Sequence, residues 1–385
     1  MKYGDIEVLA SEKGSFIVKG RKKYVRLGEN ELRYLFKVRG IKTKDFEFSN
    51  NYEISNESKA ILDEKFKEWG FLSQGDNEEK SNSKIDISMI HLVTINPDKF
   101  LDKIYPIGKI FFSKVFLGIY IVANFILTML IGINAESVLY DLENMNYTSS
   151  SIAIIFIAML LTVMLHELGH AFVCKKYGGK VSKMGLVLFF LLPCLFCDVS
   201  DIYLMKKKKE KVFVSIAGLY VNSMLATLSL LVYFIIGSDT NISSYLLLYY
   251  ISNMGFIVYN LIPFVKLDGY WLLSACININ NLLTKSVISA IASIFNIKLV
   301  INASAPIIKK VFLVIYGWAV LLFRPIFWYF SIAEIYSISN SIMSDTSFKI
   351  VIILVSLIAV LDIMKFVFKY IKLFKKDRQQ IFNFL

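Results

Sequence analysis

The segment HELGH, residues 166–170, holds the side chains best suited to chemistry in this sequence. His166 and His170 are four residues apart and therefore share one face of a helix. Two imidazoles at this spacing can bind one zinc ion, with Glu167 beside a metal-bound water. Zinc lowers the pKa of such a water to about 7, so Glu167 can take its proton and later pass it to a leaving amine. The pattern predicts metal-assisted hydrolysis of a peptide bond, and a chance match to HExxH is the alternative.

The sequence around this segment, LLTVMLHELGHAFVCKK, is the end of a long apolar run. A charged group at the centre of a membrane helix costs about 2.5–3.5 kcal/mol on insertion scales, and ionisable groups there are by default functional candidates. Two imidazoles and a carboxylate in such a run need a reason, and a bound metal ion supplies one. Gly169 leaves room for another chain to approach this site.

A catalytic zinc ion needs three protein ligands and an open position. The sequence has three histidines, and the remaining one, His91, lies before the first apolar span. We therefore expect a carboxylate as the third ligand, and Asp268 in NLIPFVKLDGYW is the best candidate. It follows an apolar span that should cross the membrane in the same direction as the HELGH span. Pro263 breaks that helix and Gly269 permits a sharp turn. The alternative is that Asp268 lies in an ordinary turn beside the membrane.

The composition indicates a membrane protein. Of the 385 residues, 56% are hydrophobic, whereas soluble domains average about 45–50%. The first residues are polar and have no apolar core, so we expect membrane entry to begin at a later, retained segment. The net charge of +12 comes largely from lysines in short loops beside apolar runs, and the sequence has no nucleic-acid motif. Nucleic acid is therefore not an expected partner.

Six apolar stretches are long enough to cross a membrane, for which a helix needs roughly 20 residues. They lie at 111–133, 149–173, 212–236, 244–265, 308–330 and 349–371. The stretch 184–199 is too short and contains a proline, so we expect a hairpin or re-entrant element that protein must cover. Residues 281–303 are moderately apolar and predict a further interfacial or re-entrant helix.

Basic residues are divided unequally between two sets of loops. The loops at 134–149, 237–243 and 331–347 contain no Lys or Arg, whereas the intervening ones are rich in lysine. Because cytoplasmic loops carry the excess of positive charge, we expect both termini in the cytoplasm.

The beginning of the chain has the pattern of a small soluble domain. SFIVK at 15–19 and KYVRL at 23–27 alternate as two strands of a hairpin. Amphipathic helices at 29–38 and 55–69 follow, and we expect a closing strand at 71–72. This order suggests an α+β winged-helix-like domain.

The predicted fold class is therefore mostly α, a polytopic helical bundle of about six spans with this small α+β domain in front. We expect the winged-helix-like domain at 1–72 and a polar, low-complexity linker at 73–88. An interfacial segment at 89–110 follows, because it is half apolar and interrupted by prolines. The membrane domain then covers 111–372, and a basic cytoplasmic tail covers 373–385.

HELGH in one span and N-x-x-P-x-x-x-L-D-G in a later span resemble the paired motifs of the site-2 protease family of intramembrane zinc metalloproteases. HELGHAFVCKKYGGKVSKMG and NLIPFVKLDGYWLLS are most similar to a bacterial subgroup of peptide zinc metalloproteases. The resemblance implies the plasma membrane of a bacterial cell. It also implies a Zn2+ ion held by His166, His170 and Asp268, with Glu167 as the base.

The same resemblance implies roles for two asparagines. Asn260 would orient the substrate backbone near the metal, and Asn222 in AGLYVN would help to bind substrate. Leu219 stands where that motif usually has a proline, which weakens the expectation for Asn222. A substrate helix must unwind before cleavage, and we expect the hairpin within 181–200 to pair with the unwound segment.

The substrate implied is a peptide or membrane protein. The pattern of residues 1–72 resembles winged-helix modules that bind leader peptides, which favours maturation of a ribosomally made precursor, bacteriocin-like or signalling. One alternative is cleavage of a membrane-anchored regulator, and another is a non-catalytic peptide-export or immunity partner. For residues 1–72 the alternative is a stabilising domain without a specific partner.

Four other polar or sulfur-containing residues lie in apolar surroundings. Cys194 and Cys197 form a C-x-x-C without a second pair, so we expect apolar cysteines without metal or redox function. Arg324 and Asp362 lie at similar depths in two spans. We expect them to pair across helices, and the alternative is that each faces a water-filled cleft.

Overall fold

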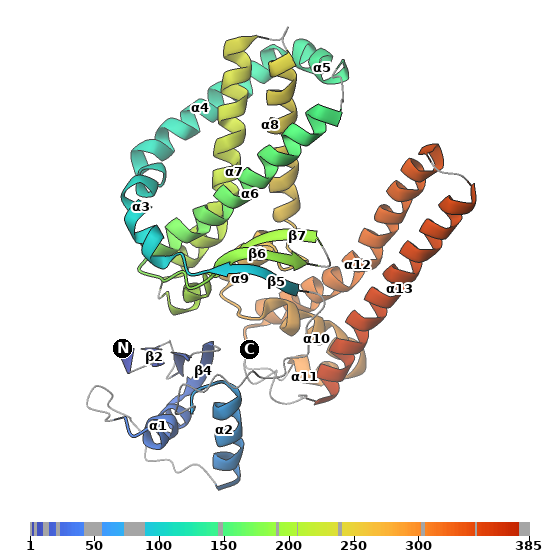
Figure 1. Cartoon of the computed structure of the whole chain (residues 1–385). Helices are drawn as coiled ribbons and strands as arrows, with labels where there is room; N and C mark the ends of the chain where they lie inside the picture. Colours follow the sequence, from blue (N-terminus) through green and yellow to red (C-terminus); the bar gives the residue numbers. More distant parts are fainter. Residues whose placement is uncertain are drawn as a thin grey trace. The chain divides into compact units, whose positions relative to one another are not determined.

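The computed structural model describes residues 2–3, 6–10, 15–20, 24–41, 56–72, 89–144, 149–189, 192–205, 207–237, 241–301, 305–342 and 345–376. The chain folds into two compact units, Met1–Ile257 and Val258–Leu385. Both are mostly helical (Figure 1). The predicted linker lies outside the described residues, as does most of the predicted basic tail.

The first unit begins with a four-stranded antiparallel sheet in the order β1-β2-β3-β4. The predicted hairpin is present as β3 (Ser15–Lys19) and β4 (Tyr24–Gly28), and β1 (Lys2–Tyr3) and β2 (Ile6–Ala10) extend it. The helices α1 (Glu29–Val38) and α2 (Asn56–Glu68) are also as predicted.

The predicted closing strand at 71–72 is wrong, because these two residues form a bend. The Phe71 side chain is fully buried, and a Cβ on Gly20 would lie 2.3 Å from its ring. Phe71 thus packs its side chain in the core of the N-terminal domain, and its backbone does not extend the sheet. The assignment as a winged-helix domain remains a prediction.

The six predicted spans are present as helices that are long and apolar enough to cross a membrane. They are α4 (Lys114–Ile133), α6 (Ser149–Lys176), α7 (Lys208–Ile236), α8 (Asn241–Asn260), α12 (Ile307–Ile342) and α13 (Asp345–Lys376). The short helix α5 (Ala135–Glu143) follows α4. The chain is therefore a multi-pass membrane protein.

A second sheet forms beside the end of α6. Its strands are β5 (Met89–Ile95), β6 (Met184–Phe189) and β7 (Leu192–Cys197), in that order, and β7 packs against α6 (Figure 1). The expected hairpin at 184–199 is thus confirmed as β6 and β7.

The strand β5 was not foreseen, because residues 89–110 were expected to form a segment lying on the membrane surface. They form β5 and the helix α3 (Asp98–Phe111), and their position at the membrane surface remains a prediction. A Cβ on Gly185 would lie 1.9 Å from the Val93 carbonyl oxygen, so glycine permits the close approach of β5 to β6. The partner strand begins about 90 residues later in the chain, which is why local sequence does not reveal the pairing.

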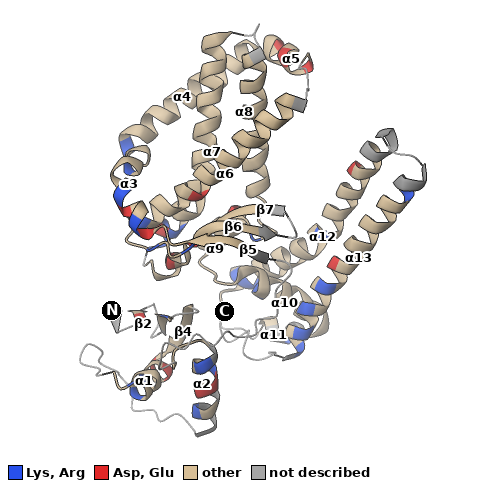
Figure 2. Cartoon of the chain, in the orientation of Figure 1, with Lys and Arg blue, Asp and Glu red and all other residues tan. Residues whose placement is uncertain are grey.

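Lysines in the membrane part of the first unit gather toward one end of its helices, where Asp98 and Asp102 of α3 also lie. Lysines gather on α3, at the last turn of α6 and at the start of α7 (Figure 2). Acidic residues lie on α5, which follows the far end of α4 (Figure 2). This separation matches the loop pattern from which the orientation in the membrane was predicted.

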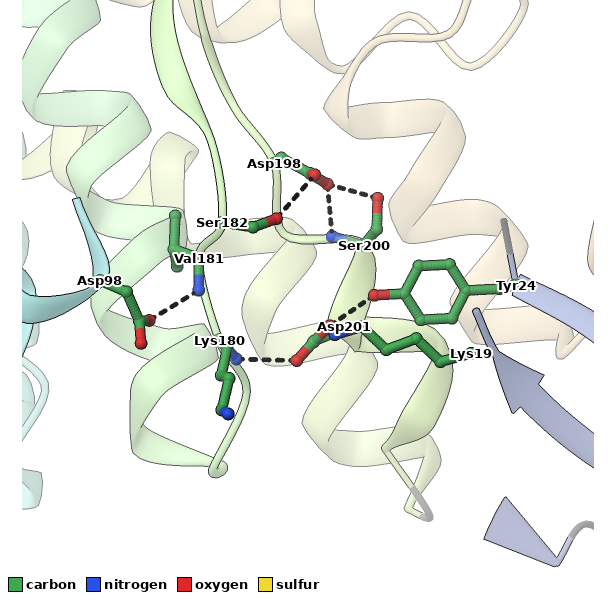
Figure 3. A network of polar contacts seen from close by, with 9 residues as sticks. All are labelled: Lys19, Tyr24, Asp98, Lys180, Val181, Ser182, Asp198, Ser200 and Asp201. Atoms are coloured by element: carbon green, nitrogen blue, oxygen red, sulfur yellow. Dashed lines mark hydrogen bonds and ion pairs between the residues drawn. The ribbon is translucent and has the colours of Figure 1, made fainter. Parts of the chain in front are cut away.

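The N-terminal sheet contacts the membrane domain at Asp201, in the 3-10 helix η1 (Ser200–Leu204) that follows β7. The buried Asp201 carboxylate accepts hydrogen bonds from the Lys19 ammonium, the Tyr24 hydroxyl and the Lys180 backbone amide, the last at 2.9 Å (Figure 3). The backbone amide of Val181, next to Lys180, donates a hydrogen bond to the carboxylate of Asp98 at the start of α3, at 2.9 Å (Figure 3). Together these contacts fix the segment between α6 and β6.

The second unit is built around α10 (Leu282–Phe295), with α9 (Asp268–Ile277), α11 (Ile297–Ile301), α12 and α13. Helix α10 is buried along most of its length, as Val287 and Ile288 show. A Cβ on Gly317 of α12 would lie 2.0 Å from the Ser286 carbonyl oxygen, so the two helices pack backbone to backbone. Residues 281–303 were expected to form an interfacial or re-entrant helix; they contain α10 and α11, and their position in the membrane remains a prediction.

Candidate metal centre

The two histidines of HELGH face each other inside the first unit. His166 and His170 lie on consecutive turns of α6, and their side chains are buried, with the residues 3% and 7% exposed. Their Nε2 atoms are 3.2 Å apart. The predicted sharing of one helix face is therefore confirmed.

Each imidazole is oriented by a carbonyl oxygen at its other nitrogen. The His170 Nδ1 lies 2.7 Å from the Val214 backbone oxygen, and the His166 Nδ1 lies 2.7 Å from the Asn222 Oδ1. Carbonyl oxygens only accept hydrogen bonds, so each Nδ1 carries the proton and each Nε2 of a neutral ring carries a lone pair. Two lone pairs directed together at this distance repel each other unless a cation lies with them. The donor set thus has the chemistry of a metal site.

Glycine makes room at these nitrogen atoms. A Cβ on Gly218 of α7 would lie 2.4 Å from the His166 Nε2 and 2.5 Å from the His170 Nε2. On the facing helix α6, a Cβ on Gly169 would lie 3.0 Å from the Ala217 carbonyl oxygen of α7. The chain that Gly169 admits is therefore helix α7. The role of Gly218 was missed, although its spacing of four from Asn222 places both on one helix face.

The carboxylate of Glu167 lies toward the strand β7. Burial and the negative charge of Glu167 together raise the pKa of the Cys194 and Cys197 thiols above the ordinary value. Neither cysteine is in a disulfide, and a raised pKa favours the protonated thiol at neutral pH. The influence of Glu167 on both thiols puts an edge strand beside the expected base, and the absence of a metal or redox function at these cysteines remains a prediction.

An aromatic ring on α8 also contacts His166. The ring of Phe256 on α8 meets the His166 ring edge to face, with centroids 5.6 Å apart. The contact of Asn222 is with the imidazole, whereas its predicted role was binding of substrate. His91, rejected as a ligand, pairs through its backbone in β5 opposite Val187.

Asn260 and Asp268 lie in the second unit, at the end of α8 and the start of α9. Helix α8 ends before Pro263, as expected, and the Tyr316 hydroxyl donates to the Pro263 carbonyl oxygen. A Cβ on Gly269 would lie 2.2 Å from the Leu261 carbonyl oxygen, so the chain folds back tightly here. The sharp turn predicted at Gly269 is confirmed. The role of Asp268 as a ligand remains a prediction.

Comparisons with known proteins give consistent results for this region. Residues 154–239 match the model of peptidase family M50. The chain is 30% identical over 129 residues to "Putative peptide zinc metalloprotease protein YydH" of Bacillus subtilis, covering 33% of this chain and 49% of that protein.

It is also 35% identical over 132 residues to "Zinc metalloprotease MJ0392" of Methanocaldococcus jannaschii, covering 33% of this chain and 35% of that protein. The chain thus spans half or less of the length of these curated relatives. No solved structure matches it.

Proposed function

We propose that this chain, whose residues 154–239 match the model of peptidase family M50, is a zinc-dependent endopeptidase that acts within or beside the membrane. The observation that carries this proposal is the pair of buried imidazoles whose Nε2 atoms are 3.2 Å apart, next to Glu167 on a span. A zinc ion bound there would polarise the scissile carbonyl and activate the attacking water.

Asp268 is the proposed third ligand. It follows Phe256, whose ring contacts His166, by twelve residues of chain, and it opens helix α9. Two imidazoles and one carboxylate form a ligand set typical of catalytic zinc.

Glu167 is the proposed general base and acid. It takes the proton of the attacking water and then gives it to the leaving amine, which regenerates the carboxylate.

The substrate is proposed to bind as an added strand. A helical substrate has its amides hydrogen-bonded internally, so it must unwind before its carbonyl can react. The strand β7 is an edge of its sheet and lies beside Glu167, which suits it to pair with the unwound segment. Asn260 is proposed to orient the substrate backbone.

The proposed substrate class is a small ribosomally made peptide precursor. Residues 1–72 are proposed to bind its leader peptide. The name of the Bacillus subtilis relative, "Putative peptide zinc metalloprotease protein YydH", supports this class over a membrane-anchored regulator. The lysine-rich helix ends support a location in a bacterial plasma membrane with both termini in the cytoplasm. An intact Glu167 argues against a non-catalytic partner.

The first test separates metal binding from catalysis. Glu167→Gln should retain zinc but lose cleavage by about 10²–10⁴-fold, because general acid–base catalysis contributes this much. Asp268→Ala should lose zinc as well as activity. Metal content and cleavage of a membrane peptide are measured on the purified protein, with Glu136→Gln on α5 as the matched control. Full proteolysis by Glu167→Gln would refute the assignment.

A second test addresses the substrate. A variant without residues 1–72 is compared with the whole chain for binding of a leader peptide and for cleavage of a spanning protein. Loss of leader binding supports peptide maturation. Unchanged cleavage of the spanning protein, with no leader binding by either form, favours the regulator alternative.

A further inference from the structure

Two fully buried amide side chains link His166 to helix α8. Asn222 on α7 and Asn253 on α8 are both 0% exposed. A buried amide without hydrogen bonds destabilises the fold. Both lie in helices that are apolar enough to cross a membrane, where such groups are uncommon. Their position therefore needs an explanation beyond packing.

The direction of each hydrogen bond is determined by the acceptor at the far end. The Asn253 Nδ2 donates to the Tyr249 backbone oxygen at 3.0 Å, and the Met159 sulfur is a second, weaker acceptor at 3.7 Å. A carbonyl oxygen cannot donate, so the amino group of Asn253 must point to it. The Asn253 Oδ1 is then the atom that faces Asn222.

The orientation of the Asn253 amide determines the orientation of the Asn222 amide. The Asn222 Nδ2 donates to the Asn253 Oδ1 at 3.3 Å, so the Asn222 Oδ1 faces the His166 ring. An amide rotated by half a turn would instead present its amino group to the Nδ1 of His166. The imidazole proton would then move to Nε2, which is the nitrogen that must coordinate a metal ion.

The second histidine needs no such device. The His170 Nδ1 donates to the Val214 backbone oxygen, an acceptor whose direction cannot reverse. Only His166 relies on a side-chain amide, which has two distinct ends. An additional residue that holds this amide in one orientation is therefore useful at His166 alone.

We propose that Asn253 is a positioning residue that acts through Asn222 to keep the proton of His166 on Nδ1, and so keeps Nε2 available for metal. This inference rests on the proposed metal site and adds a residue that the family motifs in this sequence do not include. The competing explanation is that Asn253 only ties α8 to α7.

The test compares two variants that each break one hydrogen bond between α7 and α8. Asn253→Leu removes the contact with Asn222, and Ser229→Ala removes the bond from Ser229 Oγ to the Leu246 oxygen at 2.6 Å. Zinc affinity is measured by competition with a chelator on the purified full chain in detergent. Asn253→Leu should weaken zinc binding by about 10–100-fold, as removal of outer-shell partners typically does. Ser229→Ala should not weaken it.

A double-variant cycle tests whether Asn253 acts through Asn222. Asn222→Ala should weaken zinc binding, and adding Asn253→Leu to it should weaken binding no further. Additive losses would overturn the proposal, and so would parental affinity in Asn253→Leu. Thermal unfolding without metal checks that each variant is folded.

A third measurement does not depend on metal. The chain has three histidines, so nitrogen NMR of the metal-free protein labelled at histidine can resolve their tautomers. The parent should show His166 protonated at Nδ1, and Asn253→Leu should show a mixture. If the parent binds no zinc but shows this difference, the proposed function fails while the positioning role stands. An unchanged tautomer in Asn253→Leu overturns the positioning role.

Discussion

His166 and His170 differ in what holds them, although they carry out the same proposed task. One imidazole donates to a backbone oxygen of α7 and the other to the Asn222 side chain of the same helix. Helix α7 therefore orients both rings, and its glycine at position 218 leaves space at both Nε2 atoms. The chemistry of the site depends on this second helix as much as on HELGH.

Gly218→Ala should weaken zinc binding by roughly 10–100-fold. The added methyl would lie within 2.5 Å of both Nε2 atoms, and overpacking of this kind costs about 1–3 kcal/mol, each 1.4 kcal/mol being tenfold in affinity. Metal titration of the purified variant measures the change. Gly255→Ala on α8 is the matched control, because its Cβ would meet nothing within 4 Å. Equal zinc affinity in both variants would contradict the argument.

The helix pair α12–α13 illustrates how whole elements are held in the apolar part of the second unit. Arg324 donates to Asp362 at 2.5 Å, and Trp328 donates to the same carboxylate at 3.1 Å. The Arg324 guanidinium also lies 3.9 Å from the centre of the Phe366 ring. The predicted pairing across helices is confirmed, so the two charges satisfy each other.

Asp362→Ala should destabilise this helix pair by up to about 2.5–3.5 kcal/mol, the insertion cost of a charge left at the centre of a span. The double variant Arg324→Met with Asp362→Leu should be closer to the parent, because no charge remains unpaired. Thermal unfolding in one detergent compares the three proteins. A double variant less stable than Asp362→Ala alone would show that the pair does more than neutralise charge.

At the scale of the whole first unit, the carboxylate of Asp201, in the segment between α6 and α7, accepts two side-chain hydrogen bonds from the N-terminal sheet. Burial alone would raise the pKa of Asp201, but hydrogen bonds from Lys19, Tyr24 and the Lys180 amide lower it below the ordinary value (Figure 3). The same hydrogen bond, after burial, raises the pKa of the Tyr24 phenol, which therefore stays protonated. The charged form of Asp201 is thus the form that binds.

Docking of this sheet should weaken in acid. A carboxyl whose pKa is lowered by folding stabilises fully above its ordinary value of 3.8, and this contribution is lost as the pH falls through the lower native value. Asp201→Asn should therefore show faster hydrogen exchange in β3 and β4 already at neutral pH. The control is Asp198→Asn, because the carboxylate of Asp198 accepts hydrogen bonds from Ser182 and Ser200, which lie outside β3 and β4. Equal exchange in both variants would exclude Asp201 as the point of docking.

Several features of this protein follow from sequence alone because they depend on neighbours along the chain. The spacing of His166 and His170 places them on one helix face in any α-helix. Six long apolar runs specify six helices, since a span must satisfy its backbone internally. The hairpin at β6 and β7 and the two helices of the N-terminal domain are likewise local.

Other features required the tertiary structure because they depend on residues far apart in the chain. No local pattern shows that β5 adds to a hairpin 90 residues away, that Phe71 fills a core, or that Asp201 receives Lys19. At the metal centre the sequence supplied the imidazoles, whereas the orientation of their protons came from α7 and α8. The periodicity of a sequence shows on which face of a helix a side chain lies. Tertiary packing determines which atoms of other helices that side chain contacts.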